Sequence, residues 1–583
     1  MNTQLSVRDA VTDLGDRPAP ESTPYAEKAS AGYELLGRIV ADLGGSSRAI
    51  ASHAEVSAAL FDWSAILAPR LLPVLSGHLN LTVGAIERLG NGSAYQRQLL
   101  AELDSMDSMG VMLLTEGSAG SAVTEQQTRA EWHAEDGGYF VFTTAAAGAY
   151  KWMGNVGDHT PRTVIVTARL IVDGTDEGVF PFLVRLRDTA DGALADGVRV
   201  VSLPERAGAP MDNAMTAFMG LRAPADALLC GDWARWDTDG RFRCDLSLPE
   251  RSRRAIGQLQ AGRVSLASAA VAAARAGLAL TWSYASNRLT SGGVLMSDRD
   301  GVQFDLVSAT AQVYAMTTLA NAVRHRIAAA PASTASAMLA MLAKPVLSRS
   351  AREVLQTCRE LATAQGLFRV NHLADWIDAA ECVITAEGDN KRLQIATGGQ
   401  LGSRRWSRAD HERLAVRDAD EVLPWWHRML VDREQTMLDD AQEGELHGVV
   451  VTGPDRAAIE IAVAVSERLA SEALATAADT VTDPIARAIV DDLAAVFALE
   501  CVDRHAGWFA ARGRMTPDLS ITITNALARR HASLVPHLSM LVDAFAIPLE
   551  VLDAPIDGDP VPWWLNYAGW QDMSAIGTQE AVR

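Results

Sequence analysis

Glu387 stands where an apolar segment of the chain meets a glycine. The run Cys382 to Ile384 leads through two small residues into Glu387, and Gly388 follows at once. The segment could be an ordinary element end, where polar residues meet water and glycine turns the backbone. Alternatively, Glu387 could be a carboxylate held at an apolar site to move a proton, with Gly388 allowing close approach of another group. Taken alone, these residues favour the element end, because carboxylates in clefts are uncommon.

Residues 113–132 hold an apolar run that ends in a loop rich in small residues. Thr115, Gly120 and Ser121 lie in this loop, and its exposed backbone N–H groups could hold an anionic phosphate. An ordinary loop explains the pattern better when it is considered by itself.

Trp152 lies in a second segment, residues 146–159, beside Gly154 and Asn155. An aromatic side chain next to glycine can pack on a planar ring while backbone amides hydrogen-bond the edge of that ring. A core tryptophan before a turn is the plainer interpretation of this segment alone.

Several common motifs are absent from the sequence. It contains no GxGxxG after a strand, no GxxxxGK[ST], no HExxH and no GxSxG. The twelve histidines show no spacing typical of metal ligands, so we expect no metal site. These absences disfavour a Rossmann dehydrogenase, a P-loop NTPase, a zinc protease and an α/β-hydrolase.

Composition limits the partners and the compartment. The net charge of −20 argues against nucleic acid and against an anionic membrane surface. The sequence contains no run of about 18 uncharged apolar residues, so we expect no membrane span. The five cysteines form no CxxC pair and are expected to be reduced. The sequence shows neither a secretory signal nor a peroxisomal C-terminal signal, so we expect a cytoplasmic protein.

Taken in order, the segments resemble the acyl-CoA dehydrogenase and oxidase superfamily. The sequences that carry this resemblance are LLTEGSAGS (113–121), YKWMGNVG (150–157), ARLIVDGTDEGVFPFLVRLRD (168–188), PMDNAMTAFMGLRAPADALL (210–229), AGRVSLASAAVAAARAGLALTWSYASNR (261–288), CRELATAQGLFRVN (358–371) and AEGDN (386–390). The chain is similar to the oxidase branch rather than the dehydrogenase branch, because it continues in a long helical region after the AEGDN segment.

The resemblance implies a mainly α fold with a central β domain. The expected parts are an N-terminal helical domain (1–112), a β-barrel-like domain (113–250), a helical bundle that carries the catalytic glutamate (251–405) and a second, C-terminal helical bundle (406–583).

The resemblance also implies bound FAD, held without a Rossmann fold and across the interface of a homodimer. Glu387 would be the general base that removes an α-proton from an acyl thioester, and Gly388 would keep the backbone there uncrowded. The residues implied to contact FAD are Thr115 at the flavin ring, Gly120 and Ser121 at the pyrophosphate or thioester, Trp152 beside the isoalloxazine, Gly154 and Asn155 near N5, Arg288 at the pyrophosphate of the other subunit, and Gln365, Gly366 and Asn390 close to the same cofactor.

The expected activity is FAD-dependent α,β-desaturation of an acyl thioester, from acyl-CoA to trans-2-enoyl-CoA, with O2 as the electron acceptor and H2O2 as the product. One alternative is a dehydrogenase that acts on an acyl-CoA or an acyl-carrier protein and passes electrons to an electron-transfer flavoprotein. A different class is a binding module that retains the fold without catalysis. The acyl chain and the carrier of the thioester are left open.

Overall fold

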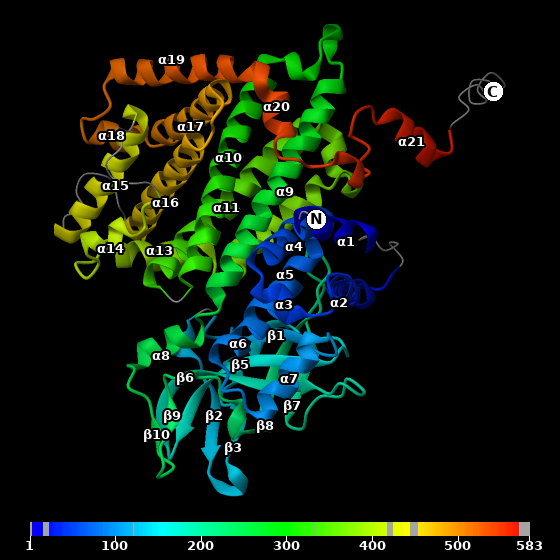
Figure 1. Ribbon diagram of the computed structural model, residues 1–583, viewed down its shortest axis with the longest axis vertical. Coiled ribbons are helices and arrows are strands. Elements are labelled where there is room, and N and C mark those ends of the chain that lie inside the picture. The colour runs from blue at the N-terminus through cyan, green and yellow to red at the C-terminus, as the bar shows by residue number, and fades with distance from the viewer. Residues whose placement is uncertain are drawn as a thin grey trace. The chain divides into compact units, whose positions relative to one another are not determined.

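The computed structural model describes residues 3–14, 23–120, 122–331, 333–416, 424–443 and 453–570. By its internal contacts the chain divides into two compact units, Met1–Leu266 and Ala267–Arg583 (Figure 1). The first unit contains short helices and a mixed sheet, and the second contains long helices. The predicted fold class, mainly helical with a central sheet, is confirmed, while the four domain boundaries stay a prediction.

Short helices open the first unit. In α2 the buried side chains of Tyr33, Leu36 and Val40 recur at spacings of three and four, which places them on one helix face. Ser93 begins α7 by accepting a hydrogen bond from the backbone N–H of Gln96 at 3.3 Å. The helices are α1 (Thr3–Leu14), α2 (Tyr25–Asp42), α3 (Ser47–Ser52), α4 (Ala54–Leu67), α5 (Leu72–Leu75), α6 (Gly84–Leu89) and α7 (Ala94–Asp104), with a π-helical segment at Ser76–Val83.

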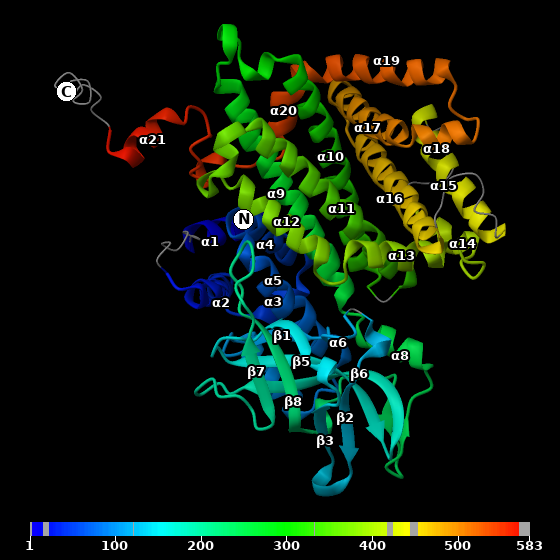
Figure 2. The ribbon, with the colours of Figure 1, turned by 180° about the vertical axis from the view of Figure 1, so that it is seen from behind.

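One eight-stranded mixed sheet follows these helices (Figure 2). Its hydrogen-bonded order is β1-β5-β2-β3-β8-β4, with β6 paired to β5 and β7 paired to β8. The end strands β1 and β4 contact each other, so the sheet curls toward the expected barrel. The strands are β1 (Met109–Leu113), β2 (Thr128–His133), β3 (Tyr139–Thr144), β4 (Lys151–Asn155), β5 (Arg162–Val172), β6 (Thr175–Arg187), β7 (Val198–Ser202) and β8 (Asn213–Pro224).

The sequence predicts a hairpin, because residues 162–172 and 178–187 are rich in Val, Ile, Phe and Thr and the turn-forming residues DGTDEG lie between them. The hairpin is present as the antiparallel pair β5 and β6. Its connection is shorter than the six-residue loop DGTDEG suggested. Only Asp173 and Gly174 form the turn, and both have positive φ, at 49° and 77°. This is the geometry of a type I′ turn, which matches the twist of the strands it joins and lets Thr175 begin β6.

Buried aromatic side chains fill the core of the sheet. Phe140 and Phe142 both meet Phe182 edge-on, with ring centroids 5.1 Å apart in each pair. Phe180 and Phe218 extend the same apolar cluster. Phe140 and Phe142 alternate along β3 and Phe180 and Phe182 along β6, so each pair points to one face of the sheet.

The long helix α9 (Leu259–Asn287) begins at the end of the first unit and continues into the second. Among the described residues it is the one helix long and apolar enough to cross a membrane, but 89% of its apolar window is buried inside the protein. Its many small residues allow neighbouring helices to pack closely. At Gly277, for example, a Cβ would lie 2.8 Å from a side-chain methyl of Leu355. We therefore interpret α9 as a core helix.

The second unit is built around long packed helices. Figures 1 and 2 show α10, α11, α16 and α17 side by side, in agreement with their contacts. Val313, Met316, Leu319, Val323 and Ile327 recur at spacings of three and four, which predicts one core-facing stripe. On α10 the first four are buried, and Ile327 is only partly buried. The helices are α10 (Asp300–Ala329), α11 (Thr334–Leu361), α12 (Leu373–Thr385), α13 (Asn390–Leu401), α14 (Arg408–Glu412), α15 (Trp425–Glu443), α16 (Pro454–Asp479), α17 (Pro484–Arg504), α18 (Ala506–Ala511), α19 (Pro517–Leu534), α20 (Leu538–Asp543) and α21 (Val561–Ala568).

Candidate functional site

Glu387 lies in the turn that joins α12 to α13. Its φ is 54° and that of Gly388 is 95°, so both residues have left-handed backbone conformations. An ordinary helix end places glycine at the first left-handed position, whereas here it is occupied by a glutamate. That conformation costs a non-glycine residue about 1 kcal/mol or more. The segment is thus an element end, as the plainer interpretation held, but one whose backbone strain falls on the carboxylate-bearing residue.

Polar contacts fix the start of α13 directly after this turn. The Asp389 carboxylate accepts a hydrogen bond from the Arg392 N–H at 3.0 Å and so caps the helix. The buried Asn390 amide donates to the Ser348 hydroxyl at 3.0 Å and to the Pro345 carbonyl at 3.4 Å, both in α11. The Asn390 side chain therefore anchors α13 to α11.

Gln365 and Gly366 lie in a 3-10 turn, Thr363–Leu367, after α11. A Cβ at Gly366 would come within 2.6 Å of the Arg359 carbonyl, so close approach to the end of α11 already requires glycine there. The side-chain oxygen of Gln365 accepts a hydrogen bond from the Trp564 indole at 3.2 Å. This contact connects the 3-10 turn to α21.

Arg288 follows the last residue of α9 and is exposed to solvent. Its guanidinium lies 5.3 Å from the centre of the Tyr284 ring and donates to the Tyr284 hydroxyl. Within the described part of the chain, Arg288 forms no ion pair with a carboxylate. Its charge is available to an anion such as a pyrophosphate.

In the first unit, the structure brings together the two loop segments that the sequence singled out. The Trp152 N–H donates to the Thr115 carbonyl at 2.9 Å, and the Gly117 N–H donates to the Tyr150 carbonyl at 3.1 Å. A Cβ on Gly117 would overlap the Tyr150 ring, which explains the glycine at this position. Gly120, with φ of 53°, turns the loop back so that its N–H meets the Glu116 carbonyl at 2.8 Å.

A buried ion pair joins these two segments. Lys151 Nζ lies 3.0 Å from the Glu116 carboxylate, and both side chains are at most 1% exposed. Glu116 also accepts hydrogen bonds from the N–H groups of Gln127 and Thr128 and from the Thr128 hydroxyl. Burial lowers the pKa of Lys151 to about 8, although the Glu116 carboxylate favours the charged form. Near neutral pH the pair is therefore charged on both sides.

Sequence reasoning missed this pair as part of the site. Glu116 and Lys151 lie next to Thr115 and Trp152, but nothing local showed that the two side chains meet across 35 residues of chain. The signal that could have found them is that Glu116 and Lys151 are the single charged residues of the short sequences 113–121 and 150–157.

Trp152 presents a ring surface to solvent at the start of β4. It is 38% exposed, and a β-bulge between Trp152 and Gly154 places Met153 at φ 54°. Gly154 has a packing reason of its own, because a Cβ there would overlap the Leu113 side chain of β1. The exposed indole lies on the strand that is hydrogen-bonded to Thr115, which gives a face for a planar ring beside a hydroxyl.

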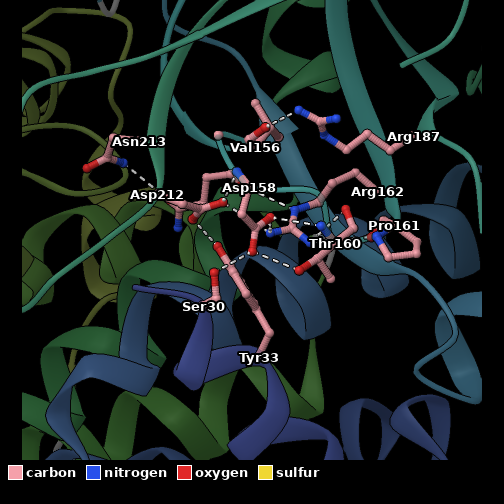
Figure 3. A network of polar contacts seen from close by, with 12 residues as sticks. Ser30, Tyr33, Val156, Asp158, Thr160, Pro161, Arg162, Arg187, Asp212 and Asn213 are labelled. Atoms are coloured by element: carbon pink, nitrogen blue, oxygen red, sulfur yellow. Dashed lines mark hydrogen bonds and ion pairs between the residues drawn. The ribbon is translucent and has the colours of Figure 1, made fainter. Parts of the chain in front are cut away.

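Asn155, at the end of β4, contacts a polar network around Arg162, of which Figure 3 shows Arg162, Asp158, Asp212 and Asn213. Its side-chain oxygen accepts from the Asn213 amide at 2.7 Å, and its carbonyl accepts from Arg162 Nε at 3.0 Å. The Arg162 guanidinium also pairs with Asp158 at 2.7 Å and with Asp212 at 3.1 Å.

The same network reaches back to α2. The guanidinium of Arg162 lies 4.1 Å from the centre of the Tyr33 ring, and the Tyr33 hydroxyl donates to Asp212. Burial raises the pKa of Tyr33 well above its usual value, so this hydroxyl keeps its proton. The network connects helix α2 to the strand end that carries Asn155. Its members are too far apart in the sequence for local patterns to reveal it.

The donor set suits FAD in both units. The first unit offers an aromatic face, the Thr115 hydroxyl and backbone groups for a flavin ring, and the second offers the Arg288 guanidinium for a pyrophosphate. Ser121, the remaining predicted residue, lies outside the described residues. Among those described, no group of three or more His, Cys, Asp or Glu side chains could hold a metal ion.

Comparisons with known proteins agree with the resemblance. Residues 252–398 match the family model "Acyl-CoA dehydrogenase, C-terminal domain", and residues 443–559 match "Acyl-CoA oxidase". Acyl-coenzyme A oxidase 3 of Arabidopsis thaliana is 28% identical over 294 residues, which cover 49% of this chain and 43% of the relative. Human peroxisomal acyl-coenzyme A oxidase 3 is 25% identical, covering 53% and 47%. The matches thus span about half the length of these relatives.

Solved structures share the fold over nearly the whole chain. Acyl-CoA oxidase-2 of Caenorhabditis elegans, bound with FAD, ascaroside-CoA and ATP, superimposes with a TM-score of 0.82 at 17% identity, covering 98% of this chain and 90% of that one. Acyl-CoA oxidase 1 of Yarrowia lipolytica gives a TM-score of 0.76 at 19% identity, covering 97% and 92%.

The comparisons correct the predicted compartment. The related oxidases of Arabidopsis and human are named as peroxisomal proteins, and this contradicts the cytoplasmic prediction. That prediction rested on targeting signals not found in the sequence, and failure to recognise a signal does not establish a compartment, because import signals are short sequences read by receptors.

The family models, the relatives and the shared fold all lead to the same group of proteins. The chain is therefore similar, in two family domains and in its fold, to acyl-CoA oxidases of the acyl-CoA dehydrogenase and oxidase superfamily.

Proposed function

We propose that the protein is an FAD-dependent acyl-CoA oxidase. It removes a proton from the α-carbon and a hydride from the β-carbon of an acyl-CoA, giving the trans-2-enoyl-CoA, and O2 takes up the electrons to give H2O2. The match of residues 443–559 to the acyl-CoA oxidase model supports O2 over an electron-transfer flavoprotein as the acceptor. The single observation that carries the proposal is Glu387 in a strained, left-handed turn at the end of α12.

Glu387 is proposed to take the α-proton. Glu387 is half-buried at the end of an apolar segment, and a carboxylate placed within reach of a C–H bond can serve as its general base. The backbone strain at Glu387 fits this role, because strained residues persist where the surrounding structure fixes them and are frequent at active sites. Gly388 adds no side chain next to the reacting carbons.

FAD supplies the hydride acceptor when it is bound. Thr115, Trp152, Gly154 and Asn155 are proposed to hold the flavin ring, with Gly120 and Ser121 near the pyrophosphate or the thioester. The Glu116–Lys151 ion pair and the network around Arg162 keep these segments in place.

Further cofactor contacts are proposed for the second unit. Arg288 would neutralise the pyrophosphate of FAD from the other subunit of a homodimer. Its exposed guanidinium, which pairs with no carboxylate among the described residues, supports this role. Gln365 and Gly366 would approach the same cofactor. The side-chain amide of Asn390 already donates to Ser348 and Pro345. Asn390 would therefore contribute to cofactor binding by fixing the position of α13.

The test uses the purified holoenzyme and a panel of acyl-CoA and acyl-carrier-protein thioesters of different chain lengths. Under anaerobic conditions, the flavin absorbance is expected to bleach with at least one acyl-CoA, and admitting air should restore it with one H2O2 formed for each enoyl product. A protein without flavin, or one that no thioester bleaches, would contradict the proposal. Bleaching that air does not reverse would indicate the dehydrogenase alternative.

A further inference from the structure

Lys344 lies in the interior of the second unit, next to the Glu387 turn. Its side chain comes from α11 and is fully buried. The ammonium donates to the Ile384 carbonyl at 2.9 Å and to the Gly388 carbonyl at 2.8 Å. Ile384 is in the last turn of α12, and Gly388 directly follows Glu387. One side chain therefore bridges the two ends of the turn.

Burying a lysine in a protein interior costs free energy. Its charge loses the solvation of water, and an apolar side chain of similar size usually costs less. The electrostatics at this position recover part of that cost, because the last carbonyls of a helix carry partial negative charge. The ammonium donates to two main-chain carbonyls on either side of Glu387, so Lys344 fixes the path of the backbone there.

The backbone that Lys344 fixes is the strained one. Glu387 adopts φ of 54°, and Gly388, at 95°, has the conformational freedom of glycine and does not constrain its neighbour. Without a contact that closes the turn, Glu387 would relax toward right-handed or extended conformations and its carboxylate would move. The Ser348–Asn390 contact holds α13 but lies beyond the turn.

We propose that Lys344 is the positioning residue for Glu387: by bridging the Ile384 and Gly388 carbonyls, it holds the carboxylate in the place where it meets the substrate α-proton. The inference rests on the proposed function of Glu387 as the base. It assigns to the chain a residue that touches neither substrate nor cofactor but on which the rate of proton removal depends.

The test compares Lys344→Met with Lys391→Met, which removes an exposed lysine next to the same segment. Both holoenzymes are mixed anaerobically with acyl-CoA, and the limiting rate constant of flavin reduction and the dissociation constant of the substrate are measured separately. Displacement of a reacting group by about 1 Å can cost on the order of 100-fold in rate. Lys344→Met should therefore lower the rate constant by about 10- to 100-fold and change the dissociation constant by less than about threefold, whereas Lys391→Met should match wild type.

Hydrogen exchange gives a readout that does not depend on turnover. Peptides covering residues 383–392 should exchange faster in Lys344→Met than in wild type, with other parts of α11 and α12 unchanged. If Lys344→Met does not fold, Lys344→Gln replaces it, since the shorter amide cannot bridge both carbonyls and should also slow flavin reduction.

A wild-type rate constant in a folded Lys344 variant would overturn the inference, and so would a loss confined to substrate binding. Glu387→Gln separates the two proposals. If that variant reduces flavin at the normal rate, the base assignment fails, and the hold of Lys344 on the turn is then judged from hydrogen exchange alone.

Discussion

Replacing Lys151 by methionine tests the buried ion pair that joins the two predicted flavin-binding segments. The substitution keeps the length of the side chain and leaves the Glu116 carboxylate buried without its cation. Removing one partner of a buried pair typically costs about 3–5 kcal/mol of the free energy of unfolding. Glu116 keeps three hydrogen bonds from Gln127 and Thr128, so we expect a loss at the lower end, about 3 kcal/mol.

The double variant Glu116→Gln/Lys151→Met should lose less than the sum of the two single variants. It contains neither charge, so no uncompensated ion is left in the interior, and a loss of about 1–2 kcal/mol is expected. Because the pair holds Thr115 against Trp152, the Lys151→Met protein should also bind FAD more weakly than wild type.

Urea unfolding of the single and double variants gives the free energies, and hydrogen exchange of peptides covering 112–118 and 150–156 confines the effect to the two segments. Glu131→Gln, an exposed glutamate on β2, is the matched control and should change stability by less than about 0.5 kcal/mol. A loss below about 1 kcal/mol in Lys151→Met, or strict additivity in the double variant, would refute the reasoning.

Two further predictions concern stability, and one concerns the binding of FAD. Burial lowers the pKa of His78 to about 4, whereas an unfolded histidine titrates near 6.5. The neutral, buried His78 therefore stabilises the fold fully above pH 6.5, and this stabilisation is lost as the pH falls toward 4. In urea unfolding, His78→Gln should remove up to about 3 kcal/mol of that acid-induced loss. Gly117→Ala forces a methyl group into the Tyr150 ring and should release FAD more readily, measured by flavin fluorescence during dilution. Arg468→Met leaves Glu434 buried without the guanidinium that lies 2.8 Å away and should cost about 3 kcal/mol or more, seen as a lower melting temperature.

Ordered motifs supplied most of the residues of the proposed site. Thr115 and Trp152 are far apart in the chain, yet their joint appearance in the resemblance predicted one cofactor-binding region, and a hydrogen bond between their backbones joins them. The hairpin of β5 and β6 followed from two segments rich in Val, Ile, Phe and Thr with turn-forming residues between them, although the Asp173–Gly174 turn is shorter than expected. The position of Glu387 at the end of an apolar segment was also evident from the sequence.

The supporting contacts were not predictable. Lys344 is separated from Gly388 by 44 residues and Arg162 from Asp212 by 50, so neither pairing leaves a periodic or local signal. Glycine is similarly ambiguous: Gly154 and Gly366 fit the motif of a cofactor site, but packing against Leu113 and Arg359 already accounts for both. A sequence shows which residue types are present, whereas the structure shows which packing contacts require a given residue at a position.

The rate constant of anaerobic flavin reduction by an acyl-CoA, compared between wild type and Glu387→Gln, tests the central claim most directly. Glutamine keeps the size of the side chain and removes the base, so the rate constant should fall by at least about 100-fold while the substrate still binds. The control is Glu381→Gln, at an exposed position on α12, the helix that precedes the Glu387 turn. It should reduce its flavin like wild type. Reduction of the flavin in Glu387→Gln at the wild-type rate would contradict the account.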